Sequence, residues 1–214
     1  MFISKILLDV KIPAVFHDLS SINFLHDTFS SLAGGGKFVY RIDSVPLEKS
    51  GFIQPVVLVS ENKPDASLTG KPAAYFRSIE CYEYNIPVRQ GMNYKFLLKA
   101  NPSARIFFFH SDIEQPELQK KWLESESAAN GFELLDCKVT PDGYITCKEK
   151  KVKLLSAVFE GSMKITDEKK FRDMLNYGIG RGREYGLGLV SVESYGCKNR
   201  NMAEEMKAHA ENLQ

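Results

Sequence analysis

The sequence lacks the long apolar runs and cysteine pairs that mark several protein classes. Its apolar N-terminus is interrupted by Lys5 and Asp9, so we expect neither a signal peptide nor a membrane span. The four cysteines form no CxxC pair, which argues against a zinc site or a redox motif. Cys137 and Cys147 flank a predicted hairpin and could face each other, but we expect reduced thiols in a cytoplasmic protein that contacts no membrane.

Metal-binding patterns and an excess of positive charge are missing as well. The chain has no HxH or DxD pattern and no clustered carboxylates, so we expect no metal site and no cofactor. The formal net charge is only +1, from 28 lysines and arginines against 27 acidic residues. Any binding of nucleic acid must therefore depend on local basic clusters and not on the overall field.

Glycine is concentrated near the C-terminus. Five of the fifteen glycines occur close together, at Gly178, Gly180, Gly182, Gly186 and Gly188. A dinucleotide-binding motif runs strand, glycines, helix, whereas these glycines follow a helical pattern and precede a strand, which excludes that motif. Arg181 and Arg183 lie between the glycines. We predict a backbone cradle for a phosphodiester chain; the alternative is a surface loop that only closes a strand.

The pattern of predicted elements repeats along the chain and indicates an α+β protein. Ile22, Leu25, Phe29 and Leu32 recur at helical spacing. The expected elements are a strand at 1–10, a helix from 20 or 21 to 33, strands at 38–42, 55–60 and 94–99, a strand at 106–109, a capping-box helix at 111–130, a hairpin of 132–140 and 144–147 around Pro141-Asp-Gly143, a strand at 154–164, a helix at 167–177 and a strand at 187–193.

This order predicts two tandem ferredoxin-like (RRM-like) domains. We expect the first domain at 1–100 and the second, with the glycine-rich loop, at 101–194. Asn101-Pro102 is the expected boundary, because a residue before proline leaves the helical region. A helical tail is expected at 195–214.

The chain resembles the CasE (Cse-type) endoribonucleases of the type I-E Cascade complex, within the superfamily of CRISPR repeat-associated RNA-binding proteins. The resemblance rests on the glycine spacing and on short stretches in the family's order. These are Met1-Phe-Ile-Ser-Lys-Ile-Leu-Leu8, Leu25-His26, Leu97-Leu-Lys-Ala-Asn-Pro102, Trp122-Leu123, Gly131-Phe132 and Val158-Phe-Glu-Gly161.

The resemblance implies a metal-independent endoribonuclease that matures CRISPR RNA. The ribose 2′-hydroxyl would attack the adjacent phosphorus and leave a 2′,3′-cyclic phosphate, with His26 moving a proton. Lys150 or Lys151 best match the family's active-site lysines, and Lys148 and Lys153 of the same run would contact RNA together with the glycines and arginines of the loop. The implied partners are precursor and mature CRISPR RNA, with its repeat hairpin, and other Cascade subunits.

Several departures from the family pattern keep two alternatives open. Asn23 replaces a tyrosine, Asp27 follows His26, and Phe107-Phe-Phe-His-Ser-Asp112 replaces a basic segment. These changes favour a catalytically weak or inactive CRISPR RNA-binding subunit of the same fold. A scaffold whose main role is protein contact is the third hypothesis. For any single lysine of the run, a solvated surface charge is the simplest interpretation.

Overall fold

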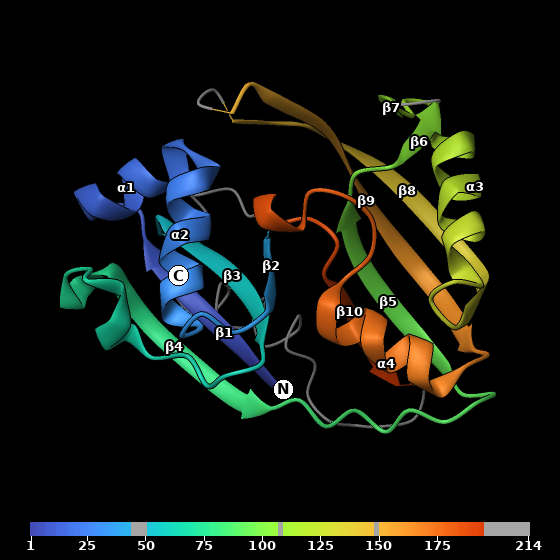
Figure 1. The fold of residues 1–214 in the computed structure, drawn as a ribbon, viewed down its shortest axis with the longest axis horizontal. Coiled ribbons are helices and arrows are strands. Elements are labelled where there is room, and N and C mark those ends of the chain that lie inside the picture. Colours follow the sequence, from blue (N-terminus) through green and yellow to red (C-terminus); the bar gives the residue numbers. More distant parts are fainter. Residues whose placement is uncertain (44–50, 107–108, 148–149, 195–214) are drawn as a thin grey trace.

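The computed structural model describes residues 1–43, 51–106, 109–147 and 150–194. It contains two four-stranded antiparallel sheets, which lie side by side, and a two-stranded hairpin (Figure 1). In chain order the elements are β1 (Phe2–Asp9), α1 (Pro13–Ser20), α2 (Ile22–Leu32), β2 (Phe38–Ile42), β3 (Ile53–Ser60), η1 (Ala66–Thr69), η2 (Ala73–Tyr75), β4 (Phe76–Glu83), β5 (Asn93–Ala100), β6 (Ser103–Ile106), β7 (Phe109–Asp112), α3 (Pro116–Ser127), β8 (Phe132–Cys147), β9 (Val152–Ile165), α4 (Glu168–Tyr177), η3 (Arg183–Tyr185) and β10 (Val190–Ser194).

The first sheet has the strand order β2-β3-β1-β4. Helices α1 and α2 connect β1 to β2, and the short 3-10 turns η1 and η2 take the place of a second helix between β3 and β4. This is the order of a ferredoxin-like domain. Leu25, Phe29 and Leu32 are fully buried against this sheet, as their spacing predicts, and Ile22 is partly buried.

The second sheet repeats the arrangement with the order β10-β5-β9-β8. Helix α3 connects β5 to β8, and α4 connects β9 to β10. The prediction of two ferredoxin-like domains is therefore confirmed. The predicted strand 94–99, however, is the first strand of this second sheet, paired with β9 and β10. A boundary within residues 84–92 fits the sheets better than one near residue 100, because Asn101-Pro102 only ends β5.

The predicted turn at Pro141-Asp-Gly143 is wrong. Strand β8 continues through these residues to Cys147, with a shift of register between Pro141 and Gly143. An edge strand tolerates proline at such a bulge, and β8 is the last strand of its sheet. Cys137 lies opposite Gly161, and Cys147 lies opposite Val152, so the two cysteines do not face each other.

The helix predicted from Ser111 begins later, at Pro116. Ser111 belongs to β7, where it pairs with Ala104 of β6, so the capping-box pattern does not act as a cap. Proline is favoured at the first position of a helix because its missing N–H would have no partner there. Helix α1 was not predicted, and the tail at 195–214 lies outside the described residues.

Strand β2 holds the two domains together. Arg41 is almost fully buried; its Nη1 donates to the hydroxyl of Ser191 at 2.8 Å, and its Nε pairs with Asp43 at 2.5 Å. A small hydrophobic cluster spans the same contact: Val39, Val57, Val59 and Leu189. Because Leu189 directly follows the glycine-rich loop, this contact fixes the loop relative to the first domain.

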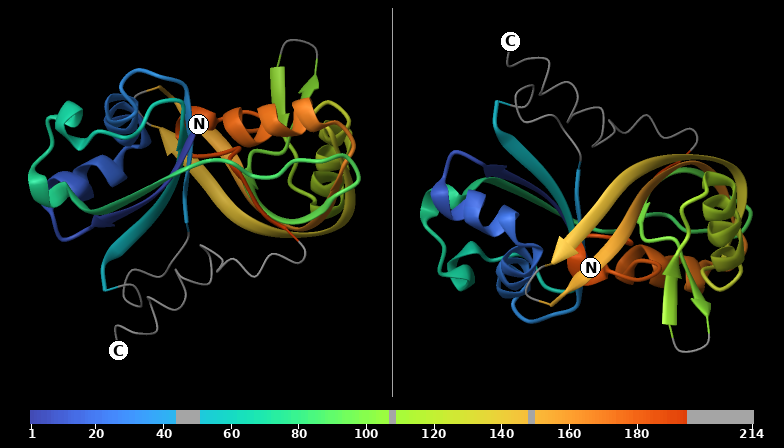
Figure 2. Two further views of the ribbon diagram at one scale, coloured as in Figure 1. Left: turned by 90° about the horizontal axis from the view of Figure 1, so that it is seen from below. Right: turned by 90° about the horizontal axis from the view of Figure 1, so that it is seen from above.

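The β8–β9 hairpin reaches from the second sheet towards α2, as two further views show (Figure 2). On its inner face, Cys147 and Leu154 of the hairpin pack against Tyr185 and Leu187 of the glycine-rich loop. The hairpin tip, α2 and the glycine-rich loop thus meet at the junction of the two domains.

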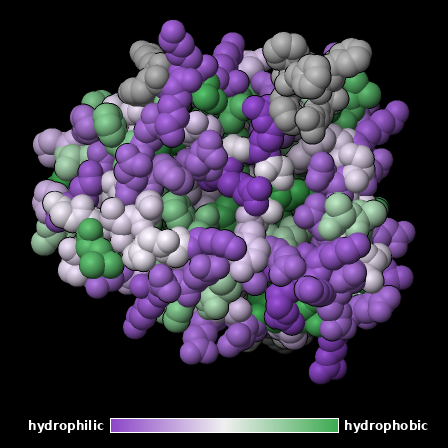
Figure 3. All heavy atoms as spheres, viewed as in Figure 1, coloured by the Kyte–Doolittle hydropathy of each residue, from purple (hydrophilic) through white to green (hydrophobic). Residues whose placement is uncertain are grey.

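Hydrophilic side chains predominate on the face of the molecule shown in Figure 3.

Candidate active site

His26 lies on α2 at the edge of the first hydrophobic core. Its ring centroid is 5.1 Å from that of Phe38 and 6.5 Å from that of Tyr40, and the side chain is half-buried. The Nδ1 atom is buried and has no hydrogen-bond partner among the described residues. Nε2 is therefore the nitrogen left to meet a substrate, and it shares that side with the backbone of Glu184, which hydrogen-bonds to the ring.

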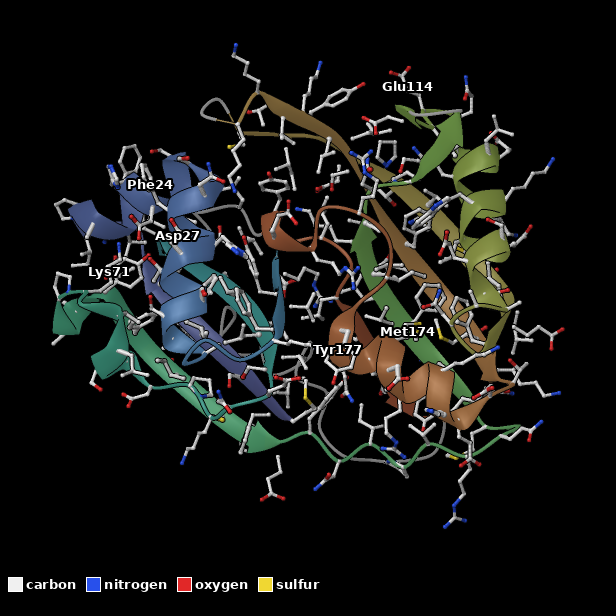
Figure 4. The ribbon with its side chains drawn as sticks, in the orientation of Figure 1. Phe24, Asp27, Lys71, Glu114, Met174 and Tyr177 are labelled. Atoms are coloured by element: carbon white, nitrogen blue, oxygen red, sulfur yellow. The ribbon has the colours of Figure 1, made fainter. Side chains whose placement is uncertain are left out.

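Burial lowers the pKa of His26 below its usual value of 6.5, because desolvation disfavours the imidazolium. The nearby Asp27 and Glu184 oppose this shift, and the positive charge of Lys150 adds to it. Asp27 is labelled on α2 in Figure 4. The lowered pKa keeps most of the imidazole neutral at pH 7, which is the form that accepts a proton.

The glycine-rich loop, residues 178–188, connects α4 to β10 and contains η3. All five glycines have a positive φ, between 75° and 87°. A Cβ atom on Gly188 would lie 2.4 Å from the carbonyl oxygen of Ile179, and one on Gly178 would lie 2.8 Å from the carbonyl oxygen of Gly188. Glycine is therefore required here so that the two ends of the loop can pack backbone against backbone.

The other three glycines fit the loop against side chains of both domains. Added Cβ atoms would lie 2.8–3.1 Å from neighbouring side chains, namely Gly180 from Trp122, Gly182 from Leu154 and Gly186 from Tyr40. The spacing of the glycines thus has a purely intramolecular explanation. An additional role in holding RNA phosphates stays a prediction.

Tyr40 of β2 contacts both His26 and η3. Its hydroxyl donates a hydrogen bond to the carbonyl oxygen of Glu184 at 3.0 Å. Burial raises the pKa of Tyr40 well above its usual value of 10, so the hydroxyl keeps its proton. Helix α2 also packs directly on η3. The glycine-rich loop therefore lies close to His26.

The tip of the β8–β9 hairpin places one predicted lysine near the histidine. The charge of Lys150 acts on His26, and its Nζ lies 6.0 Å from the ring centroid of Tyr185. Lys151 is exposed in the same turn and has a positive φ of 52°. Lys148 lies outside the described residues. Lys150 is therefore the predicted lysine with the clearest connection to His26.

Lys153 lies on the outer face of the hairpin. Its neighbour Leu154 packs inwards on the glycine-rich loop, and successive side chains of a strand point to opposite faces. The Nζ of Lys153 lies 4.0 Å from the ring centroid of Tyr144, whose hydroxyl donates to Glu114 at 2.8 Å. Glu114 is labelled in Figure 4. The structure thus does not bring Lys153 to His26.

The two arginines of the loop differ in their contacts. Arg183 Nη1 donates to the carbonyl oxygen of Tyr177 at 3.1 Å, so this side chain caps the C-terminus of α4. The backbone of Arg181 bridges to Asn101, while its exposed side chain makes no hydrogen bond or ion pair with the described residues. Arg181 is consequently the loop cation most available to a phosphate.

Sequence patterns did not identify two residues that shape this site, Tyr40 and Glu184. Tyr40 occurs within an ordinary strand pattern, and Glu184 is one acidic residue between loop arginines. Their importance comes from a contact across more than a hundred residues of chain, for which no local pattern exists. Asn23 stood out only as a departure from the family, yet its Nδ2 lies 2.9 Å from Cys147 Sγ.

The described residues bear on the expected lack of a metal site and of a membrane span. They contain no group of three or more His, Cys, Asp or Glu residues that could hold a metal ion. Cleavage without a metal stays a prediction. Within the same ranges, every helix is too short or too polar to cross a membrane.

Comparison with known proteins supports the resemblance noted from the sequence. Residues 1–194 match the family described as "CRISPR associated protein". The chain is 25% identical over 215 residues to the CRISPR-associated endoribonuclease Cse3 of Thermus thermophilus, a match that covers 90% of this chain and 99% of Cse3.

Solved structures show the same fold. A Cse3 endoribonuclease bound to a 19-nucleotide RNA has a TM-score of 0.79 at 24% identity, covering 90% of this chain and all of that chain. Cas6e of Escherichia coli K-12 has a TM-score of 0.69 at 19% identity, covering 91% of this chain and all of that chain. At these identities the structural matches establish the architecture of two ferredoxin-like domains.

Proposed function

Because the chain belongs to the CRISPR-associated protein family, we propose that it is an endoribonuclease that matures CRISPR RNA. It cuts the precursor within the repeat and needs no metal ion. The observation that carries this proposal is the meeting of His26, Lys150 and the glycine-rich loop at the domain junction. The RNA-cleaving function in the name of the similar Cse3 supports it.

The reaction uses the ribose 2′-hydroxyl of the RNA as its nucleophile. His26 Nε2 removes the proton of this hydroxyl, and the oxygen attacks the adjacent phosphorus. The bond to the 5′-oxygen breaks, that oxygen takes a proton from solvent, and a 2′,3′-cyclic phosphate remains. Lys150 stabilises the extra negative charge on the phosphorane. DNA lacks the 2′-hydroxyl, so the chemistry itself selects RNA.

Binding of the RNA rests on cations around this site. Arg181 and the exposed Lys151 are placed to contact phosphates, and phosphate contacts position a nucleic acid without reading its sequence. After cleavage the protein stays on the repeat hairpin of the mature RNA and acts as a Cascade subunit. The structure of the similar Cse3 with bound RNA supports the RNA partner.

A second candidate function is a CRISPR RNA-binding subunit with little or no activity. Asp27 favours it, because its carboxylate opposes the lowering of the His26 pKa by burial and so favours the protonated ring, which cannot act as a base. The hydrogen bond from Arg183 to the carbonyl oxygen of Tyr177 also favours the inactive subunit, since that arginine already has a partner within the protein.

One experiment separates the two functions. The protein is incubated in EDTA with a CRISPR repeat RNA, and with the same RNA carrying a single 2′-deoxy substitution at the scissile nucleotide. If the protein is an endoribonuclease, we expect one cut in the unmodified RNA that leaves a 2′,3′-cyclic phosphate, and no cut in the substituted RNA. Tight binding of both RNAs without a cut would support the inactive subunit, and a cut that requires a divalent metal would refute the mechanism.

A further inference from the structure

The groups of the candidate active site come from different domains. His26 lies on α2 of the first domain, whereas Lys150, whose charge acts on it, lies at the tip of the β8–β9 hairpin of the second. The two side chains stay near each other only while the two sheets keep one relative orientation. A displacement of about 1 Å between reacting groups can cost about 100-fold in rate. The contacts that fix one domain on the other therefore bear directly on cleavage.

Strand β2, an edge strand of the first sheet, makes such contacts on both of its faces (Figure 1). Successive side chains of a strand point to opposite faces. On one face the Tyr40 hydroxyl donates to the carbonyl oxygen of Glu184 at 3.0 Å. On the other face Arg41 Nη1 donates to the hydroxyl of Ser191 at 2.8 Å and to the carbonyl oxygen of Leu97 at 3.5 Å. One strand of the first domain thus holds both η3 and β10 of the second.

The contact of Arg41 is the most directional of these. The residue is only 4% exposed, and its Nε is paired with Asp43 at 2.5 Å, so the guanidinium is held from within its own domain. Because the N–H groups of a guanidinium form a rigid fork, the ion pair with Asp43 also sets the direction of Nη1. The hydrophobic contact between the domains is non-directional, whereas a charge-assisted hydrogen bond fixes a geometry. Arg41 therefore defines how the second sheet is oriented on the first.

The second sheet carries this restraint to the hairpin tip. Ser191 of β10 pairs with Leu97 of β5, and Leu97 pairs with Glu160 of β9. Strand β9 begins at Val152, close to Lys150 in the chain. Close-packed protein interiors transmit a displacement instead of absorbing it. A change in the contact between Arg41 and Ser191 will therefore move Lys150 relative to His26.

We propose that Arg41 is a positioning residue: by fixing the second sheet on the first through Ser191, it holds Lys150 at its working distance from His26. The inference rests on the proposed function, because Lys150 and His26 are the groups of the proposed cleavage. Arg41 is buried, so it acts through the placement of Lys150 and not on the RNA.

The test is a double-mutant cycle on the rate of cleavage. Ser191→Ala removes the acceptor in the second domain and leaves the ion pair of Arg41 with Asp43 in place. We expect single-turnover cleavage at saturating RNA to slow by about 10- to 100-fold. In a Lys150→Ala background the same substitution should change the rate by less than about twofold, because the group that Arg41 positions is then missing. Equal slowing in both backgrounds, or parent-like cleavage by Ser191→Ala, would overturn the inference.

Ser162→Ala is the matched control. Ser162 is a half-buried serine of the same sheet, on β9, and its hydroxyl makes no hydrogen bond to the described residues. The control variant should cleave at the parent rate. If it slowed as much as Ser191→Ala, the effect would belong to any serine of this sheet and the role of Arg41 would be refuted.

An NMR titration of His26 gives a readout that needs no cleavage. Lys150 lowers the pKa of His26, so Lys150→Ala should raise that pKa, and should raise it less in the Ser191→Ala protein than in the parent. Asp27 on α2 and Glu184 on η3 also act on the ring, but both are present in all four proteins, so the difference between the two rises reports on Lys150. An equal rise would overturn the inference even if the parent cuts no RNA. Failure of the proposed function is thereby distinguished from failure of this inference.

Discussion

Substitution of Gly186 by alanine tests whether the glycine-rich loop depends on close packing against Tyr40. Gly186 has a φ of 77°, and an added Cβ atom would lie 3.1 Å from a ring carbon of Tyr40. A left-handed conformation costs a non-glycine residue about 1–2 kcal/mol. Overpacking a filled site adds about 1–3 kcal/mol. The free energy of unfolding should therefore fall by about 2–5 kcal/mol.

Gly35→Ala is the control for the backbone strain alone. Gly35 has a similar φ of 72°, but nothing lies within 4 Å of the position that a Cβ atom would occupy. We expect this variant to lose only about 1–2 kcal/mol. Denaturant unfolding measures both losses. Equal losses in the two variants would refute the packing argument.

The same substitution should slow RNA cleavage. A displaced Tyr40 ring cannot keep its hydrogen bond to the carbonyl oxygen of Glu184, so η3 would move relative to His26. Gly35→Ala should cleave at the parent rate, because it lies in the turn after α2, away from η3. Parent-like cleavage by a folded Gly186→Ala protein would show that the position of η3 does not matter for the reaction.

Three further predictions follow from the contacts and charges of single side chains. Arg181→Ala should flatten the slope of log affinity against log salt by about one unit in a salt titration of repeat-RNA binding, because one phosphate contact is lost; a slope parallel to the parent's would mean that the loop only closes a strand. Lys150→Ala should reduce the single-turnover cleavage rate about 10²-fold and Lys153→Ala should reduce it much less; equal effects would contradict the placement of the two lysines. Asp18 is buried and accepts hydrogen bonds from Thr28 at 2.9 Å and Tyr75 at 2.8 Å. Burial opposes the shift, but these bonds together with those from Lys71 and His17 lower the pKa of Asp18 below 3.8. The contribution of Asp18 to the free energy of unfolding should therefore be complete above about pH 4 and be lost as the pH falls further. An Asp18→Asn variant whose free energy of unfolding drops with acid just as the parent's does would contradict this.

Most of the fold could be predicted from the sequence because its signals are local. The helical spacing of Leu25, Phe29 and Leu32 predicts α2, and Asp167 caps α4 by accepting from the backbone N–H of Lys170 at 3.0 Å. The errors occurred where a local signal is overruled by pairing with a distant strand. Pro141-Asp-Gly143 is a strong turn signal, but β9 continues alongside it, so β8 absorbs it as a bulge.

The site was predictable in part, for a similar reason. His26 and the glycines can be identified from the resemblance, and the structure places them together. Their surroundings depend on contacts between domains, such as Tyr40 with Glu184 and Asn23 with Cys147. Neither pair has a sequence spacing that could reveal it. The resemblance also cannot show that Arg183 already caps α4 by donating to Tyr177.

The most direct test of the proposed function is cleavage of a repeat RNA by the His26→Ala variant in EDTA, with RNA affinity measured in parallel. Proton transfer by a positioned side chain contributes about 10²–10⁴-fold to a rate, whereas binding depends on phosphate contacts by other residues. We therefore predict that cleavage falls by about that factor while the affinity for the RNA stays within about twofold of the parent's. Cleavage at the parent rate would contradict the account, because His26 would then be only a structural residue at the edge of the core.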